Sequence, residues 1–275
     1  MNLTSARSLA GCVLIAVGLA APASAHGDIH ARIAKLTKSI RKAPGSVALY
    51  LERGELHRLH KDWAAARRDF QTVRRLAPRL VELDLHEGRL ELAAGCYDRA
   101  RQVLDRFLAG HPRHVRGLQC RARLLTLVEA KTAALRDYDT LIGLAESPNP
   151  DHYLERARVQ QGFGVDSAEV VRGLDEGVRK LGPLVVLHQG ALQIELTRRA
   201  WPQALRRLDR MLAAMPLRAP WLLRRGMVLE RMGKPAEARR AYFEGLAELD
   251  ALPRRNKIQG DLQHSLRSRL RRLSR

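Results

Sequence analysis

Apolar residues recur at helical spacing, three or four positions apart, through nearly the whole chain. Residues 46–60 and 63–76, for example, each carry such a stripe with polar residues between its members. Runs of β-branched residues and strict alternation of apolar and polar residues are scarce, and these are the patterns typical of strands. The sequence therefore predicts an all-α fold.

Side-chain size repeats along these expected helices at a nearly constant interval. One column of large apolar residues has steps of 34, 34, 36, 34 and 34 residues: Phe70, Leu104, Tyr138, Leu174, Leu208 and Tyr242. A column of mostly small residues has the same steps: Ala66, Ala100, Ala134, Val170, Ala204 and Ala238. Small residues allow two helices to cross closely, and large ones fill the space between neighbouring units. The pattern predicts a stack of two-helix units.

The clearest unit resembles the tetratricopeptide repeat (TPR) family through Tyr50, Gly54, Trp63, Ala66, Phe70 and Pro78. The resemblance covers residues 46–253 and implies a right-handed solenoid of about six TPR-like units. Two positions depart from the family pattern, because Val170 stands in the small column and Leu192 stands where Gly or Ala is expected. The middle units are therefore expected to be splayed or slightly re-registered.

The two flanks of the array are predicted to be capping helices, over 26–45 and 254–275. The C-terminal one has an apolar stripe formed by Ile258, Leu262, Leu266, Leu270 and Leu273. Its opposite face carries Arg267, Arg269, Arg271, Arg272 and Arg275. A basic amphipathic helix can also bind a membrane surface, but a polar-faced cap is what a repeat stack requires, so we favour the cap.

Residues 1–25 have the features of an export signal. Arg7 precedes an uncharged apolar run over 9–21, and small residues at Ala23 and Ala25 mark a cleavage site after Ala25. That run is short for a membrane span, and no later run is longer, so no transmembrane anchor is expected. The sequence predicts a bacterial protein located in the periplasm or secreted.

The formal net charge of +20 makes the chain attractive to anions of any kind. Aromatic residues are only 4% of the sequence, which leaves few platforms for stacking bases and makes nucleic acid an unlikely partner. Most of the basic residues are arginine, a bias that GC-rich coding also produces. The charge alone therefore does not separate a binding surface from codon bias.

No catalytic motif is present, so the chain is not expected to be an enzyme or to hold a cofactor. Histidine pairs such as His57 and His60 have no third ligand at a suitable spacing, so no metal site is expected. The acidic pair Asp175 and Glu176 is expected to lie on an exposed helix face and to form solvated salt bridges rather than to act in acid–base catalysis. Whether Cys96 and Cys120 pair is left open.

In TPR proteins the first helix of each unit lines a concave face, and the resemblance assigns a partner-binding groove by register. Its predicted residues are Arg58, Leu85, Arg89, Arg116, Gln119, Arg123, Leu154, Arg158 and Gln193. Arg89, Arg123 and Arg158 occupy one equivalent place in three successive units. Guanidinium groups in such a row suit carboxylates or phosphates, although charge balance against nearby glutamates is the alternative interpretation.

The sequence thus favours an exported TPR scaffold for protein–protein or protein–peptide interaction, with an acidic protein or peptide as its partner. The alternative is a binder of an anionic envelope polymer, such as a glycan, lipopolysaccharide or nucleic acid, through its basic surface. The identity of the partner, the pathway and the oligomeric state are left open.

Overall fold

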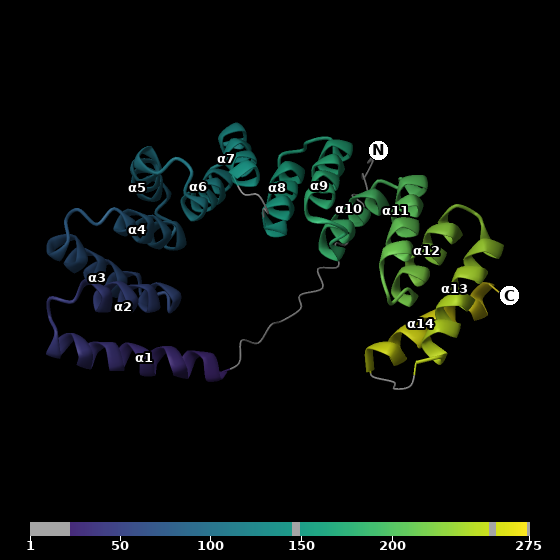
Figure 1. Ribbon diagram of the computed structural model, residues 1–275, viewed down its shortest axis with the longest axis horizontal. Coiled ribbons are helices and arrows are strands. Elements are labelled where there is room, and N and C mark those ends of the chain that lie inside the picture. Colours follow the sequence, from purple (N-terminus) through teal and green to yellow (C-terminus); the bar gives the residue numbers. More distant parts are fainter. Residues whose placement is uncertain (1–22, 145–148, 253–256, 274–275) are drawn as a thin grey trace, which may run out of the picture. The chain divides into compact units, whose positions relative to one another are not determined.

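The computed structural model describes residues 23–144, 149–252 and 257–273. Every regular element in these ranges is an α-helix (Figure 1), which confirms the predicted all-α helical-repeat fold. The fourteen helices are α1 (Ala23–Lys42), α2 (Val47–Leu59), α3 (Trp63–Leu76), α4 (Glu82–Ala93), α5 (Tyr97–Gly110), α6 (Val115–Leu127), α7 (Lys131–Leu144), α8 (Pro150–Gly162), α9 (Ser167–Leu181), α10 (Val185–Thr197), α11 (Trp201–Ala214), α12 (Ala219–Arg231), α13 (Pro235–Asp250) and α14 (Lys257–Leu273).

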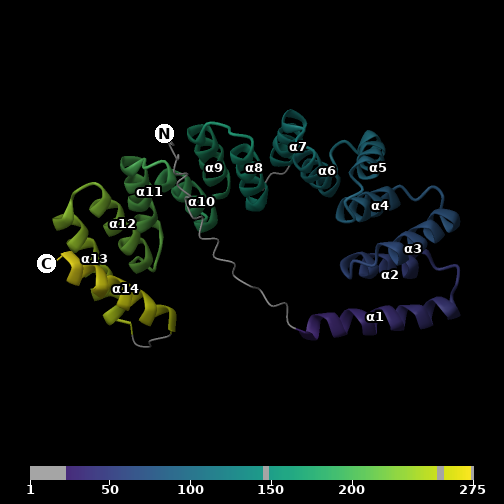
Figure 2. The same cartoon turned by 180° about the vertical axis from the view of Figure 1, so that it is seen from behind.

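The chain divides into two compact units, Met1–Gly95 with α1 to α4 and Cys96–Arg275 with α5 to α14. Within each unit, successive helices pack against one another, as both views show (Figures 1 and 2). The predicted signal peptide lies outside the described residues except for its last three, which begin α1. No helix of the described ranges combines the length and the hydropathy that a membrane crossing requires.

The first unit is held together where α3 packs against α2 and α4. Phe70 and Val73 on α3 are buried in its core with Leu83 and Leu90 on α4. A Cβ atom placed on Gly54 of α2 would lie 2.5 Å from the ring of Phe70, so the small column gives the large column room. This contact is the packing that the sequence repeat predicts.

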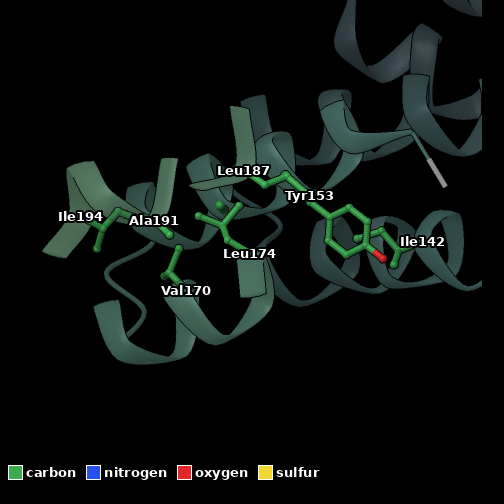
Figure 3. Packing of buried hydrophobic residues seen from close by; sticks show 8 residues of the cluster. Ile142, Tyr153, Val170, Leu174, Leu187, Ala191 and Ile194 are labelled. Atoms are coloured by element: carbon green, nitrogen blue, oxygen red, sulfur yellow. The ribbon is translucent and has the colours of Figure 1, made fainter. Parts of the chain in front are cut away.

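The second unit has a continuous series of cores of the same kind. In the one shown in Figure 3, Tyr153 from α8 and Leu174 from α9 pack with Leu187 and Ala191 from α10. Val170, the large exception in the small column, is fully buried in this cluster. The departure from the family pattern is therefore filled by apolar packing rather than left as a gap.

One arginine is completely buried in the second unit. The side chain of Arg207 on α11 is 1% exposed. It donates two hydrogen bonds to Glu195 on α10, at 2.9 and 2.8 Å, and two to Asp175 on α9, at 2.7 and 3.1 Å. Glu176, beside Asp175, pairs with the buried Arg156 and with Lys180. The predicted salt bridges are present, but Asp175 and Glu176 are half-buried rather than on an exposed face, because the helix packing encloses the arginines that they bind.

The C-terminal helix packs on α13 and α12 and buries Leu266 and Leu270. Ile258, assigned to the same stripe, is 78% exposed, so the buried face begins later in the helix than the sequence indicates. Arg269 and Arg272, predicted to lie on the opposite face, each donate a hydrogen bond of 3.1 Å to Glu230 on α12. They therefore help to attach the helix.

In each two-helix repeat, the turn between the first and the second helix contains a left-handed residue. These residues have φ between 56° and 76°, and they are Lys61, Gly95, Glu129, Gly164, Arg199 and Gly233. Glycine adopts this conformation without the steric cost that a Cβ atom brings. Three of the six turns therefore carry a non-glycine residue under local strain.

Replacing Lys61 by glycine is expected to raise the free energy of unfolding by about 0.5–1 kcal/mol, because relief of the left-handed strain exceeds the entropy that glycine adds to the unfolded chain. Chemical denaturation measures the change. The matched control is Lys38→Gly in α1, which is exposed and helical, and there the same substitution is expected to cost about 1 kcal/mol. Equal destabilisation at both positions would contradict the explanation.

Candidate functional site

In the first unit, the basic side chains that the sequence assigns to the groove surround one carboxylate. Glu55 on α2 accepts hydrogen bonds from Arg58 at 3.0 Å and from Arg89 on α4 at 3.4 Å, and its carboxylate lies 2.7 Å from Nδ1 of His86. Burial raises the pKa of Glu55, but the hydrogen bond with His86 and the charges of Arg89 and Arg58 outweigh it, so the pKa lies below its usual value. Leu85, which lies on α4 with His86 and Arg89, is buried.

A second carboxylate plays the same part between α6 and α8 in the second unit. Glu155 on α8 accepts a hydrogen bond of 3.4 Å from Nε2 of Gln119 and a charge-assisted one from Arg123, both on α6. The hydrogen bond with Glu155 raises the pKa of Arg123 above its usual value despite partial burial. Arg116, near the start of α6, is exposed.

In the second unit, three concavities lie along the first helices of successive repeats, which are α6, α8, α10 and α12. The one between α6 and α8 is lined by Thr126, Glu129, Arg158, Val159, Gly162 and Phe163. The next, about 200 Å³, lies between α8 and α10 and includes Leu154, Arg158, Gln193 and Thr197. The third, about 260 Å³, lies between α10 and α12 and includes Thr197, Arg199, Arg224 and Arg231. Because neighbouring concavities share Arg158 and Thr197, they form one hollowed face, which we call the first-helix face.

The floor of the middle concavity is formed by residues of the hydrophobic core. Leu174 and Ile194 line it and also belong to the buried cluster of Figure 3. The predicted residues Leu154, Arg158 and Gln193 stand around that floor, so the structure brings these three together at one site. A rigid apolar floor with polar groups at its edge is an arrangement suited to holding a ligand in one orientation.

The three equivalent arginines have different environments. Arg89 bonds Glu55, and Arg123 bonds Glu155, so both are neutralised within the chain. Within the described ranges no ion pair involves Arg158, and its side chain is exposed beside two of the concavities. Charge balance therefore accounts for two positions of the predicted row, and of the three arginines only Arg158 has no ion pair within the described ranges.

Sequence reasoning missed the arginines of the third concavity. Arg224 and Arg231 are seven residues apart on α12, a spacing that places both on one face of a helix, and this signal was available in the sequence. Arg199 comes from the turn after α10. Met227, on the same helix as Arg224 and Arg231, also lines the concavity.

The region around this concavity has a recognisable sequence. Residues 192–253, which begin in the middle of α10 and include all of α11, α12 and α13, match the family model described as tetratricopeptide repeat. A "TPR repeat-containing protein" from Cytophaga hutchinsonii, solved as its C-terminal part, superposes with a TM-score of 0.62 at 12% identity, over 86% of this chain and 95% of that one. The fold is that of a tetratricopeptide repeat protein.

Other solved TPR-like structures agree at similar levels. A tetratricopeptide repeat protein from Parabacteroides merdae has a TM-score of 0.52 at 15% identity, over 89% of this chain and 94% of that one. A chain of the Naa15/Naa10 complex bound to HypK-THB has a TM-score of 0.53 at 13% identity, and this chain spans only 36% of its length. No curated protein is similar enough in sequence to be matched. Tetratricopeptide proteins are in general scaffolds for protein–protein interaction rather than enzymes.

Proposed function

We propose that the chain is an exported tetratricopeptide scaffold that binds an acidic protein or peptide through its first-helix face. The observation that carries the proposal is the run of three joined concavities along α6, α8, α10 and α12, with exposed arginines at their edges. A groove of this form suits an extended segment, because successive side chains of the partner meet successive concavities. Arginine selects carboxylates, because it offers a planar, bidentate set of donors.

The groove residues of the first unit contribute differently in this proposal. Arg58 and Arg89 are already bound to Glu55, so a carboxylate from a partner would have to displace an internal one there. Arg158 has no such competitor among the described residues. The proposal therefore places the charge preference in the second unit. Export is supported by the signal-like sequence of residues 1–25.

Binding of an anionic polymer is the second candidate, and a different surface favours it. A concavity of about 430 Å³ on α14 is lined by His264, Arg267, Arg271 and Arg272 among others. A polymer of repeating charge would bind such a surface with a steep dependence on salt and little dependence on sequence. A peptide held by the first-helix face would keep the apolar part of its affinity at high salt.

The proposal predicts that Arg158→Glu removes partner binding. The protein and its variants are immobilised and exposed to bacterial envelope extract at about 50 mM and about 500 mM salt, since screening separates the two candidates. We expect a discrete protein to be retained at both concentrations, with at least about a tenfold loss in the variant, because a like charge then faces the carboxylate of the partner. Retained proteins are identified and quantified by mass spectrometry.

The matched control is Arg206→Glu, which makes the same charge change on the exposed face of α11. Its retention is expected to equal that of the unaltered protein. If both variants lose binding alike, or if only a broad set of acidic material is retained and washes off with salt, the general charge of the chain is responsible and the polymer function takes precedence.

A further inference from the structure

The concavity between α10 and α12 combines an apolar floor with a cationic edge. Leu196, Trp201, Met227 and Val228 supply the floor. Met227 is 38% exposed, which is unusual for a large apolar side chain beside a core. Arg199, Arg224 and Arg231 stand at the edge, and all three side chains are exposed.

None of these three arginines has an acidic partner within the described ranges. The two acids nearest in sequence are bound elsewhere. Glu195 accepts its hydrogen bonds from the buried Arg207. Glu230 accepts them from the hydroxyl of Tyr242, at 2.7 Å, and from two arginines of α14. The concavity therefore has an excess of positive charge that the described part of the chain does not neutralise.

Two of the three arginines are also positioned by their surroundings. The guanidinium carbon of Arg224 lies 5.2 Å from the ring centroid of Trp221, a cation–π contact with a buried ring. Arg199 is the left-handed residue of its turn, with φ of 56°, and this fixes where its side chain leaves the backbone. Such positioning lowers the entropy that a ligand must remove on binding.

We propose that this concavity binds one bulky apolar side chain of the partner, flanked in the partner sequence by acidic side chains. The volume of about 260 Å³ is below the range of about 300–1,000 Å³ that encloses a drug-sized ligand, so the site fits a side chain rather than a whole small molecule. The apolar side chain contacts Met227 and Trp201, and the flanking carboxylates pair with Arg224 and Arg231. The inference rests on the proposed function and specifies the sequence that the first-helix face selects.

The test uses the intact protein and a terminally blocked synthetic peptide in which glutamates flank a single leucine. Trp201 lines the site, so intrinsic tryptophan fluorescence reports binding. We expect saturable binding in the range of roughly 10–500 µM at low salt. A peptide with alanine in place of the leucine, and one with glutamines in place of the glutamates, are each expected to bind at least about tenfold more weakly, since each lacks one half of the recognition.

Two variants of the protein separate the contribution of the apolar contact from that of the charged contacts. Met227→Ala is expected to weaken binding of the leucine peptide at least about fivefold and to leave binding of the alanine peptide unchanged. The reason is that a substitution in the protein changes the effect of one in the peptide only where the two side chains are in contact. Arg224→Gln with Arg231→Gln is expected to abolish the preference for glutamate over glutamine. Arg206→Gln is the charge-matched control and is expected to bind like the unaltered protein. Calorimetry with each variant repeats the measurement without relying on tryptophan.

Four outcomes would overturn the inference. The first is equal binding of the leucine and alanine peptides. The second is loss of binding when the blocked terminus is present and recovery when it is a free carboxylate, which would assign the site to a chain end. The third is displacement of the peptide by heparin with an effect of Arg206→Gln equal to that of the pocket variants. A partner captured from envelope extract that is lost in Arg158→Glu but retained by Met227→Ala and the double arginine variant would also overturn it, while leaving the proposed function standing.

Discussion

Replacing Arg207 by methionine is expected to lower the free energy of unfolding by about 3–5 kcal/mol, because it leaves a buried carboxylate without its counter-charge. Glu195 is 7% exposed at its side chain and receives two hydrogen bonds from this arginine. Asp175, at 26% exposure, receives the other two but can turn toward water. The change is measured by chemical denaturation, monitored by circular dichroism.

The control is one residue away. Arg206→Met makes the same substitution at an exposed position of α11 and is expected to change stability by less than about 0.5 kcal/mol. In the double variant Arg207→Met and Glu195→Met, most of the loss is expected to be recovered, because both buried charges are removed together. A loss that persists in the double variant would mean that the size of the arginine side chain, not its charge, is what α9, α10 and α11 require.

Gly226→Ala is expected to destabilise the chain by about 1–3 kcal/mol, although alanine is the better helix former, because the added methyl group overlaps a packed ring. The Cβ atom would lie 2.1 Å from Cε1 of Tyr242 and 2.6 Å from its Cζ. That ring is fully buried, and its hydroxyl is held by Glu230. The ring therefore has no free direction in which to move. Thermal and chemical denaturation give the change.

Two comparisons isolate the overlap. Gly143→Ala, on α7 with nothing within 4 Å of the added atom, is expected to raise stability by about 0.5–1 kcal/mol. In a background that carries Tyr242→Leu, the cost of Gly226→Ala is expected to fall below about 0.5 kcal/mol, because the ring that it meets is gone. A cost unchanged by the second substitution would place the strain in the backbone of α12 instead.

The repeat itself was predictable because it is local. Gly54 and Phe70 are sixteen residues apart, and so are Gly226 and Tyr242, and in both pairs the structure shows the small residue making room for the ring. Helix boundaries were also predictable, since α3 spans the expected range 63–76. Local helical periodicity and short loops leave few ways to fold such a sequence.

The site was predicted less well. The residues Leu154, Arg158 and Gln193 share a concavity, as their positions in the TPR register imply. The same register makes Arg89 and Arg123 equivalent to Arg158, but in the structure both of them form ion pairs with glutamates of the chain. Whether an arginine is bound by an internal carboxylate depends on partners 32 to 34 residues away on the preceding or following repeat, as in the pairs Arg89 with Glu55 and Arg123 with Glu155. A column of identical residues does not carry that information.

By itself, then, the sequence determined the helical repeat, its spacing and the assignment of first and second helices, because each follows from apolar periodicity within some forty residues. Only the tertiary structure decided which charges are exposed. The rotation of each helix about its axis directs Arg207 into the core and Arg231 to a concavity, although both are arginines on neighbouring helices. Burial raises the free energy of an unpaired charge steeply, so packing, and not composition, selects the arginines that remain available to a partner.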